Sequence, residues 1–568
     1  MTNYNSIVIG SGINSLVAAT MLGKKGKKVL LLEARNEIGG LSSSLEFGDG
    51  YKCNMIYDSI KWIDPRVLKE LELENNGLKF IKPDIVRIAL GENGKHIFFN
   101  QDPLKTADSI SKLSKEDSTK WGDFVVYINK ITQFLEKLYS ITPPELPNLD
   151  FSDILSLKPM ISPFLKQGSR GIVDLLRVAP MMMNELMDEW FENELLRSSI
   201  STAGIHHLSF GPYSAGTGYN LLHQHLHSNS VFHNSFSIKG GTVELANTLK
   251  NIAKSYGVEI RTNSKVKSIQ VNQKSCEGVV LDNGDLIIAE KIISGLDPNN
   301  TFIDLVGASN LDPNFLNQLQ NIKYRGSTAR IHFAINSIPN IKGVDPDLMG
   351  TNFSICSTLE SLERASDGVK YGSISDAPYV EFNIPSMLDP DFTQSDKHVL
   401  SATVQYAPYH LRNDAWDKKS NDLLEKNTIK VIERVIPNFS STSCWCILHP
   451  YPDGTPAKYF IVPSTYKRVS KKDLAQGSGP FHLSVIGCKF DELKKTPTKL
   501  TTWNLIGADD VKLHDKAILD KNGSAPPPAP STKLQSQLKK DAELKKDILY
   551  ENVREKIIEL SKTRGIHI

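Results

Sequence analysis

The sequence predicts an α/β fold that begins with a strand–turn–helix–strand unit of the Rossmann type. Its first strand, Ile7 to Ile9, is β-branched and ends directly at Gly10. Apolar residues at helical spacing follow, from Leu16 to Leu22. Val29 to Leu32 is then continuously apolar, as expected for a parallel strand buried on both faces. Residues 4–33 are therefore expected to form one βαβ unit.

The turn between this first strand and the helix has the pattern of a dinucleotide-binding loop. Gly10 permits a sharp turn, and Gly12 lets the backbone approach a pyrophosphate. The helix begins there, and its first N–H groups offer partial positive charge to phosphates. Ser15 stands where a third glycine is usual. The candidate cofactor-binding residues of this turn are Gly10, Gly12, Ile13, Asn14 and Ser15.

A carboxylate and a second glycine pair extend the same pattern. Glu33 ends the second strand, 23 residues after Gly10, where it can accept hydrogen bonds from ribose hydroxyls. An acid at this position disfavours a 2′-phosphate and therefore NADP. Glycines also occur in plain loops, but this combination favours dinucleotide binding. The further candidate residues are Glu33, Ala34, Arg35, Gly39, Gly40 and Ser44.

The rest of the chain divides into regions with different sequence patterns. We expect a first nucleotide-binding part at 1–80, a mostly helical cap or substrate region at 81–225, a second nucleotide-binding part with a β-meander at 226–310, and a substrate-domain sheet at 311–450. An unassigned region at 451–522, a proline-rich linker at 523–532 and a charged amphipathic helix at 533–568 follow. Asn283-Gly284 predicts a hairpin turn, and Gly257 is expected to end a helix over 242–256.

Composition narrows the function classes. A net charge of +2 gives no reason to expect nucleic-acid binding. Six cysteines without a C-x-x-C pair favour reduced thiols in a cytosolic protein. No segment reaches the roughly 18 to 20 apolar residues of a membrane span, and the first apolar run, at Ile7, is a strand rather than a signal peptide. We expect a cytoplasmic protein, with peripheral membrane contact left open.

A cluster of histidines is one candidate for a metal site. His223, His225 and His227 alternate, with His206, His207 and His233 nearby, and on a strand the alternating three would share one face. This stretch instead predicts the start of a helix, where residues i and i+2 diverge. No carboxylate or cysteine lies at ligand spacing, so we expect no metal.

Several separate strings resemble one family of flavoproteins. They are Ile7 to Ala19, Leu32 to Arg35 with Gly39-Gly40, Asp188 to Glu192, Gly240 to Ala246 with Gly257 to Ile260, and Ile293 to Pro298. Together they resemble the two-dinucleotide-binding-domain flavoproteins, and within them the phytoene desaturase group. Within that group they resemble the proteins called pyridine nucleotide-disulfide oxidoreductase domain-containing protein 2. The resemblance covers roughly residues 1 to 440.

This resemblance implies FAD as the cofactor and a discontinuous Rossmann-type FAD-binding domain with a mixed α+β substrate or cap domain. It implies a contact near Val266 with the adenine end. The implied reaction passes hydride from an apolar or amphipathic, small and lipophilic substrate to flavin N5. The cap residues proposed to line its cavity are Ile154, Met160, Phe164, Leu175, Leu176, Val178, Met181 to Met183 and Leu186. An ordinary helical core is the alternative for each of them.

The carboxyl-terminal part departs from the family. Residues 440–568 lack the glycine- and proline-rich segment and final helix that face the flavin ring in that family. Helix-dipole stabilisation of reduced flavin would be lost with them. The alternative function is therefore a non-catalytic FAD-binding, partner-binding or regulatory protein derived from such an enzyme. The helix at 533–568 could pack on its own chain, bind a protein partner or lie on a membrane. No residue is assigned as catalytic.

Overall fold

The computed structural model describes twelve stretches, all within the unit Met1–Asn504. They are residues 4–47, 50–139, 173–228, 235–272, 275–322, 324, 326–335, 337–394, 396–412, 416–439, 443–448 and 462–463. The expected linker and carboxyl-terminal helix, and the cap residues Ile154, Met160 and Phe164, lie outside the described residues.

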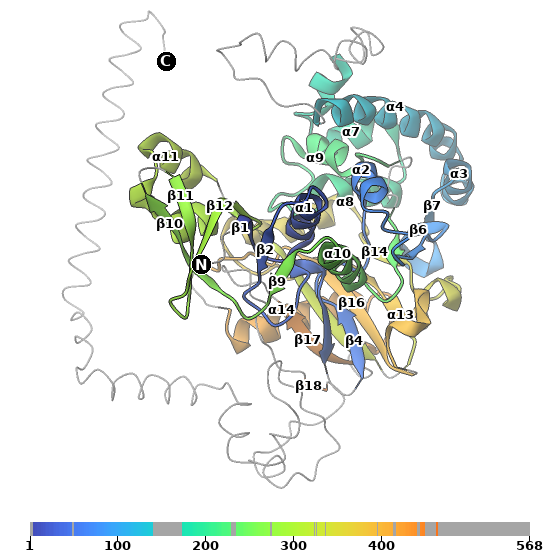
Figure 1. Cartoon of the computed structure of the whole chain (residues 1–568). Helices are drawn as coiled ribbons and strands as arrows, with labels where there is room; N and C mark the ends of the chain where they lie inside the picture. Colours follow the sequence, from blue (N-terminus) through green and yellow to red (C-terminus); the bar gives the residue numbers. More distant parts are fainter. Residues whose placement is uncertain are drawn as a thin grey trace, which may run out of the picture. The chain divides into compact units, whose positions relative to one another are not determined.

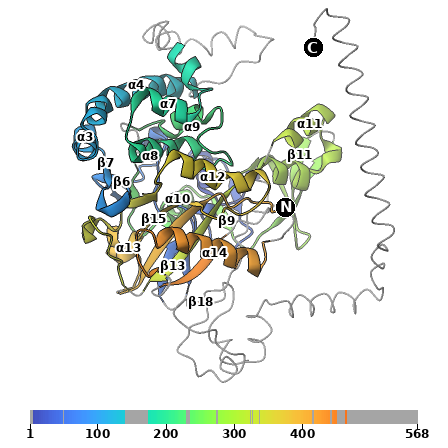
Figure 2. The same ribbon diagram turned by 180° about the vertical axis from the view of Figure 1, so that it is seen from behind.

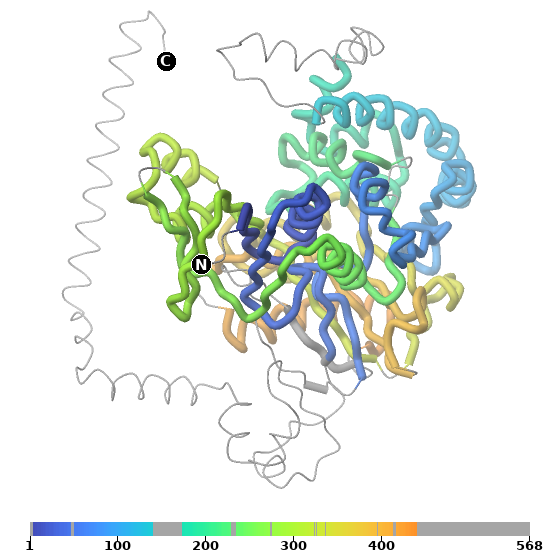
Figure 3. The backbone as a smooth tube through the Cα atoms, in the orientation of Figure 1, coloured from blue at the N-terminus to red at the C-terminus, as the bar shows by residue number. Residues whose placement is uncertain are grey.

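The predicted βαβ unit is present as β1 (Tyr4–Ile9), α1 (Ile13–Lys24) and β2 (Val29–Leu32). Its strands lie inside a six-stranded sheet of order β10-β11-β12-β1-β2-β9. β1 pairs in parallel with β12 (Leu286–Ser294) and β2, and β2 pairs in parallel with β9 (Glu259–Arg261). The amino-terminal segment, blue in Figure 3, therefore lies beside the green segment from the middle of the chain.

Both faces of this sheet are buried, which explains the continuously apolar strands. On one face Val8 and Leu31 pack with residues of α1 and α10 (Val243–Ser255). On the other face Ile7 and Leu30 pack against the antiparallel meander of β10 (Val266–Asn272), β11 (Ser275–Leu281) and β12. The hairpin predicted at Asn283-Gly284 is confirmed, since Gly284 has a φ of 89° between β11 and β12.

An eight-stranded sheet forms the second layer of the fold (Figure 1). Its order is β18 (Val462–Pro463), β17 (Ser443–Leu448), β13 (Thr328–Ile335), β16 (His398–Gln405), β15 (Tyr379–Asn383), β14 (Asn352–Ile355), β6 (Ile85–Ala89) and β7 (Ile97–Asn100). Residues 85–100 lie in the stretch expected to be mostly helical, yet they supply two of these strands. β6 pairs with β14, far along the chain, and no local pattern reveals such a partner.

The helices cover these sheets and form one separate apolar cluster. They are α2 (Pro65–Glu70), α3 (Pro103–Ser111), α4 (Lys115–Tyr139), α7 (Met183–Trp190), α8 (Glu194–Ile205), α9 (Thr217–Gln224), α11 (Pro313–Asn321), α12 (Leu359–Lys370), α13 (Pro385–Leu388) and α14 (Lys418–Ile432). Two small ribbons pair β3 (Ser44–Phe47) with β4 (Tyr51–Asn54) and β5 (Phe80–Ile81) with β8 (Ser237–Ile238). α14 packs on the apolar face of the eight-stranded sheet beside β13 (Figure 2). Among the helices that the structure describes, none is long and apolar enough to cross a membrane.

Three of the described cap residues belong to a helical core, which was the stated alternative to a cavity lining, whereas Leu176 is 68% exposed. Val178, Met183 and Leu186 are fully buried with side chains of α4, α8 and α9. These three side chains are thus packed against other helices.

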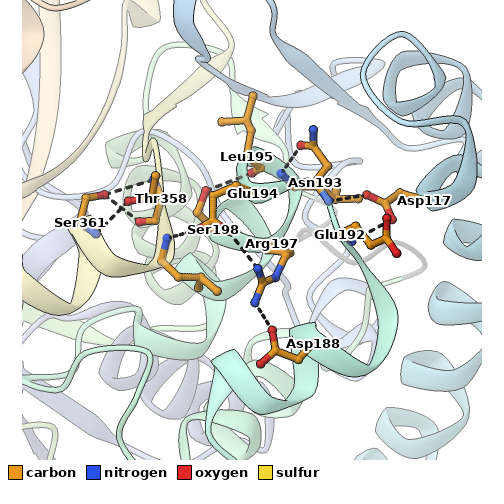
Figure 4. A network of polar contacts seen from close by, with 12 residues as sticks. Asp117, Asp188, Glu192, Asn193, Glu194, Leu195, Arg197, Ser198, Thr358 and Ser361 are labelled. Carbon is orange, nitrogen blue, oxygen red and sulfur yellow. Dashed lines mark hydrogen bonds and ion pairs between the residues drawn. The ribbon is translucent and has the colours of Figure 1, made fainter.

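A buried carboxylate joins α4 to the start of α8 (Figure 4). The two oxygens of Asp117 accept hydrogen bonds from the backbone N–H groups of Glu192 (3.0 Å) and Asn193 (2.8 Å). Glu194 in turn accepts from the N–H of Leu359 (2.7 Å), where α12 begins. These contacts attach the helical layer to the part of the chain that carries the eight-stranded sheet.

Candidate functional site

The glycine-rich turn joins β1 to α1 as the sequence predicts. Gly10 has a φ of 86°, a left-handed conformation that favours glycine. Gly12 is the N-cap of α1, and its carbonyl accepts from Leu16 N (2.9 Å). A Cβ placed on Gly12 would meet no atom within 4 Å. Open space therefore lies beside Gly12, at the N-terminus of a helix whose first turn carries no acidic residue.

Ser15, at the usual third glycine position, is accommodated by a glycine elsewhere. Its side chain is buried, and a Cβ on Gly295 would lie only 1.8 Å from Ser15 Oγ. Gly295 directly follows β12 and donates its N–H to Ile9 O (2.9 Å). A third glycine usually leaves space between the helix and the strand. Here the missing side chain of Gly295 leaves that space for Ser15.

Glu33 lies buried at the end of β2, in the position expected for a ribose ligand. Its Oε2 accepts from Ser11 N (2.9 Å) and from the Ser11 hydroxyl, and its Oε1 accepts from Arg35 N (2.9 Å). Its backbone is held by Arg261 O and Ser264 N (both 2.8 Å). The carboxylate is therefore oriented toward the glycine-rich turn. Ser11, which holds it there, was not among the predicted site residues.

The second glycine pair lies directly against the first turn. Gly39 and Gly40 have φ values of 109° and 58°, and Gly39 donates to Ser11 O (3.0 Å). A Cβ on Gly40 would lie 3.1 Å from Gly12 Cα, so the two loops touch through backbone alone. Arg35 Nη2 donates to Gly40 O (3.1 Å) and spans this loop.

The remaining predicted residues are near the glycine-rich turn and Glu33 in the chain, or begin a neighbouring strand. Ala34 lies between Glu33 and Arg35, and Ile13 and Asn14 form the first turn of α1. Ser44 begins β3, and its buried Oγ has no hydrogen-bond partner among the described residues. Val266 begins β10, two residues after Ser264, whose N–H bonds Glu33 O.

These residues fit the ADP half of a dinucleotide. Open space at Gly12 faces helix N–H groups, which suit a pyrophosphate. The Glu33 carboxylate suits ribose hydroxyls. The Ser44 hydroxyl, which has no hydrogen-bond partner among the described residues, is a further polar group available to a ligand.

A cavity of about 970 Å³ begins next to the glycine pair. Leu41, which follows Gly40, lines it together with Ile56, Tyr57, Val86, Ile303 and Tyr409. Its volume is that of a site for a sizeable small molecule. The cavity therefore begins at the residue that directly follows the second glycine pair.

One wall of the cavity is polar. Arg87 Nη2 forms an ion pair with Glu381 Oε1 (2.8 Å), and Tyr379 donates to the same oxygen (2.5 Å). Burial acts to raise the pKa of Glu381, but the Arg87 guanidinium outweighs burial and holds that pKa below its ordinary value. Arg87 also donates to Thr202 Oγ1 (3.0 Å). Glu381 is thus an ionised carboxylate with its partners in place.

A histidine pair follows α8 at the same wall. The ring centroids of His206 and His207 are 3.8 Å apart. Burial, assisted by His207, lowers the pKa of His206 to about 3, so this imidazole is neutral near pH 7. His206 and His207 belong to the histidine cluster noted in the sequence, and they line the cavity, whereas His223, His225 and His227 do not. No group of three potential ligands in the described part of the chain is placed to hold a metal ion.

Residues of the polar wall were missed by sequence reasoning. Arg87, Glu381 and Arg330, which also lines the cavity, each stand between apolar neighbours on a strand. Such alternation is typical of a strand with one face in water. The only sequence signal for these residues was a charged side chain within an otherwise apolar strand. Such a pattern does not show whether that side chain faces solvent or a cavity.

Comparisons with known proteins agree with this geometry. The family model described as flavin containing amine oxidoreductase matches residues 16–471. Pyridine nucleotide-disulfide oxidoreductase domain-containing protein 2 of Rattus norvegicus is 26% identical over 461 residues, which cover 77% of this chain and 79% of the rat protein. Phytoene desaturase of Fusarium fujikuroi is 23% identical, covering 72% and 67%. A limonene dehydrogenase component of Castellaniella defragrans is 24% identical, covering 60% and 61%.

A solved structure supports the fold. An oxidoreductase from Methanosarcina mazei superposes with a TM-score of 0.51 at 13% identity, covering 78% of this chain and 87% of that one. The predicted fold class and the resemblance to the phytoene desaturase group are confirmed, and residues 472–568 lie outside the family match. The chain belongs to the flavin-containing amine oxidoreductase family, and its cofactor is FAD.

Proposed function

We propose that this chain is an FAD-dependent oxidoreductase that removes hydrogen from a substrate held in the 970 Å³ cavity, the hydride passing to flavin N5. The observation that carries the proposal is the continuity between the two parts of the site. Gly39 and Gly40 touch the phosphate-binding turn, and the next residue, Leu41, lines the cavity. A dinucleotide bound at that turn would therefore extend toward a substrate.

Each nucleotide contact has a residue assigned to it in this proposal. Backbone N–H groups of Gly12, Ile13 and Asn14 bind the pyrophosphate, and Glu33 binds the ribose hydroxyls. The backbone at Val266 meets the adenine end. Ala34, Arg35, Gly39, Gly40 and Ser44 complete the wall along the dinucleotide, while Gly10 and Ser15 shape the turn.

The substrate is expected to have an apolar body. Bound FAD supplies a two-electron acceptor, and the protein contributes orientation and exclusion of water. Leu41, Ile56, Val86 and Ile303 give the cavity its apolar surface. The relatives named phytoene desaturase and limonene dehydrogenase support dehydrogenation of a lipophilic molecule.

The visible spectrum of the purified full chain tests the proposal. Flavin absorbance that survives dialysis, together with bleaching by a hydride donor under anaerobic conditions, is the expected result. A colourless protein that takes up no added FAD would overturn it. A protein that holds FAD but is never reduced by any hydride donor would favour the non-catalytic alternative.

A further inference from the structure

The two histidines at the end of α8 are held in a constrained backbone conformation. His206 is the C-cap of α8, and His207 has a φ of 61°. A residue other than glycine keeps such a left-handed conformation where the surrounding structure imposes it. Here Gln405 of β16 does so, because its Oε1 accepts from His207 N (3.0 Å) and its Nε2 donates to Ile205 O (2.6 Å). One buried side chain thus fixes the chain on both sides of His206.

This conformation places both imidazoles at the cavity. His206 and His207 line it, with their ring centroids 3.8 Å apart. His207 Nδ1 shares a hydrogen bond with Thr328 Oγ1 (3.3 Å), which leaves its Nε2 available to a ligand. Among the described residues, His206 forms a hydrogen bond to a side chain only through its carbonyl, which accepts from Asn220 Nδ2 (3.3 Å). Both ring nitrogens of His206 are therefore available as well.

Both imidazoles are uncharged near pH 7. Burial, and after it the neighbouring His207, lowers the pKa of His206 to about 3. Burial also lowers the pKa of His207, although the Glu381 carboxylate acts to raise it. Each neutral ring carries one N–H donor and one nitrogen acceptor. Because no hydrogen bond to the described residues fixes the tautomer of His206, this ring can take the role that His207 Nε2 does not. The pair thus presents one donor and one acceptor to the cavity.

Only some substrate groups satisfy such a pair. A hydroxyl both donates and accepts a hydrogen bond. An ether or a carboxylate only accepts, an ammonium group only donates, and a hydrocarbon does neither. The cavity also has apolar walls at Ile56, Val86 and Ile303, so the apolar body of a substrate would exclude water from the two rings. Polar groups that lose water without gaining a partner are costly.

We propose that the substrate of this flavoprotein carries a hydroxyl group that binds the available ring nitrogens of His206 and His207, with its apolar body along Ile56 and Ile303. This inference rests on the proposed function and names its substrate class, lipophilic alcohols. In this arrangement the hydroxyl donates to one imidazole and accepts from the other. The two histidines select the substrate by its hydroxyl, and the apolar walls select it by its body.

The test uses the FAD-loaded full chain and three probes with the same eight-carbon body: octanol, octyl methyl ether and octylamine. Binding is measured by calorimetry and by the shift of the visible flavin spectrum. A site built to bind a hydroxyl rejects analogues that lack it, so octanol should bind at least tenfold more tightly than the ether or the amine. An ether or an amine that binds as tightly as octanol would overturn the proposal.

Variants locate the binding groups. His206→Leu and His207→Leu should each weaken octanol binding at least tenfold and leave binding of the ether unchanged. His206→Gln should fall between, because its amide also has donors and an acceptor. His223→Leu is the matched control, since His223 is exposed on α9 and does not line the cavity, so it should bind octanol as the parent does. Unchanged octanol binding by His206→Leu would refute the placement.

Failure of this inference and failure of the proposed function have different signatures. A parent protein that prefers octanol but whose flavin is never reduced by any hydride donor keeps the hydroxyl site and overturns the oxidoreductase proposal. A parent protein whose flavin is reduced but that binds octanol and the ether equally keeps the oxidoreductase and overturns the hydroxyl site. If the leucine variants do not fold, the ranking of the three probes on the parent still decides.

Discussion

The contact between Ser15 and Gly295 makes a quantitative prediction about the cofactor helix. Gly295→Ala places a methyl group 1.8 Å from Ser15 Oγ and 3.3 Å from Ile9 O. Overpacking of a well-packed site costs about 1–3 kcal/mol, and we expect about 2 kcal/mol here because Ser15 is buried against the helix–strand contact. The methyl also pushes the N-terminus of α1 away from the pyrophosphate, which should weaken FAD binding about tenfold, or about 1.4 kcal/mol.

A second substitution should restore what the first removes. Ser15→Gly deletes the clashing hydroxyl at a helix cost of about 0.5 kcal/mol. The double variant should therefore be more stable than Gly295→Ala alone by about 1.5 kcal/mol. Unfolding in urea, followed by circular dichroism, measures stability, and quenching of FAD fluorescence measures affinity. Gly122→Ala is the matched control, since its Cβ on α4 meets nothing within 4 Å.

Two results would refute this reasoning. One is a Gly295→Ala protein that unfolds and binds FAD like the parent. The other is additivity of the two substitutions, because residues in contact are expected to couple. Either would mean that Ser15 does not occupy the space of the missing glycine.

Three further predictions concern single residues. Gly12→Val adds a side chain where the protein leaves open space, so the variant should fold. Its affinity for FAD should fall about 100-fold, or about 2.7 kcal/mol, and less flavin should remain after dialysis. Retention equal to the parent contradicts the pyrophosphate position. Glu33→Gln should weaken FAD binding about tenfold through loss of a charged acceptor, as measured by fluorescence titration, and unchanged affinity argues against a ribose contact. Asp117→Ala removes the acceptor of two part-buried N–H groups, of Glu192 and Asn193, and should lower the free energy of unfolding by about 3 kcal/mol; hydrogen exchange at these amides would stay slow if the carboxylate were unimportant.

Local sequence patterns were sufficient to predict the arrangement of the candidate nucleotide-binding residues. The turn from Gly10 to Ser15, Glu33 and the Gly39-Gly40 pair lie within one continuous stretch of about 30 residues. Their geometry follows from short-range rules: where a strand ends, where glycine is needed and where a helix begins. The structure brings these residues together as predicted, and only Ser11 and Gly295 were added to them.

The cavity required tertiary information. Arg330 and Glu381 come from strands that meet only through β16, and Arg87 comes from a strand joined to β14 by a long-range pairing. Of the cap residues considered as a cavity lining, Val178, Met183 and Leu186 belong to a helical core, which was the stated alternative. Which apolar residues face a cavity depends on the partners that helices find, and periodicity does not reveal those partners.

By itself, the sequence determined that this protein has a dinucleotide-binding βαβ unit, because each of its residues is constrained by neighbours along the chain. Only the tertiary structure decided that the polar face of the eight-stranded sheet is buried. Alternation along a strand specifies two chemically different faces, but what covers each face depends on segments hundreds of residues away. In this chain the covered polar face is a cavity wall, with Arg330 and Glu381 lining it.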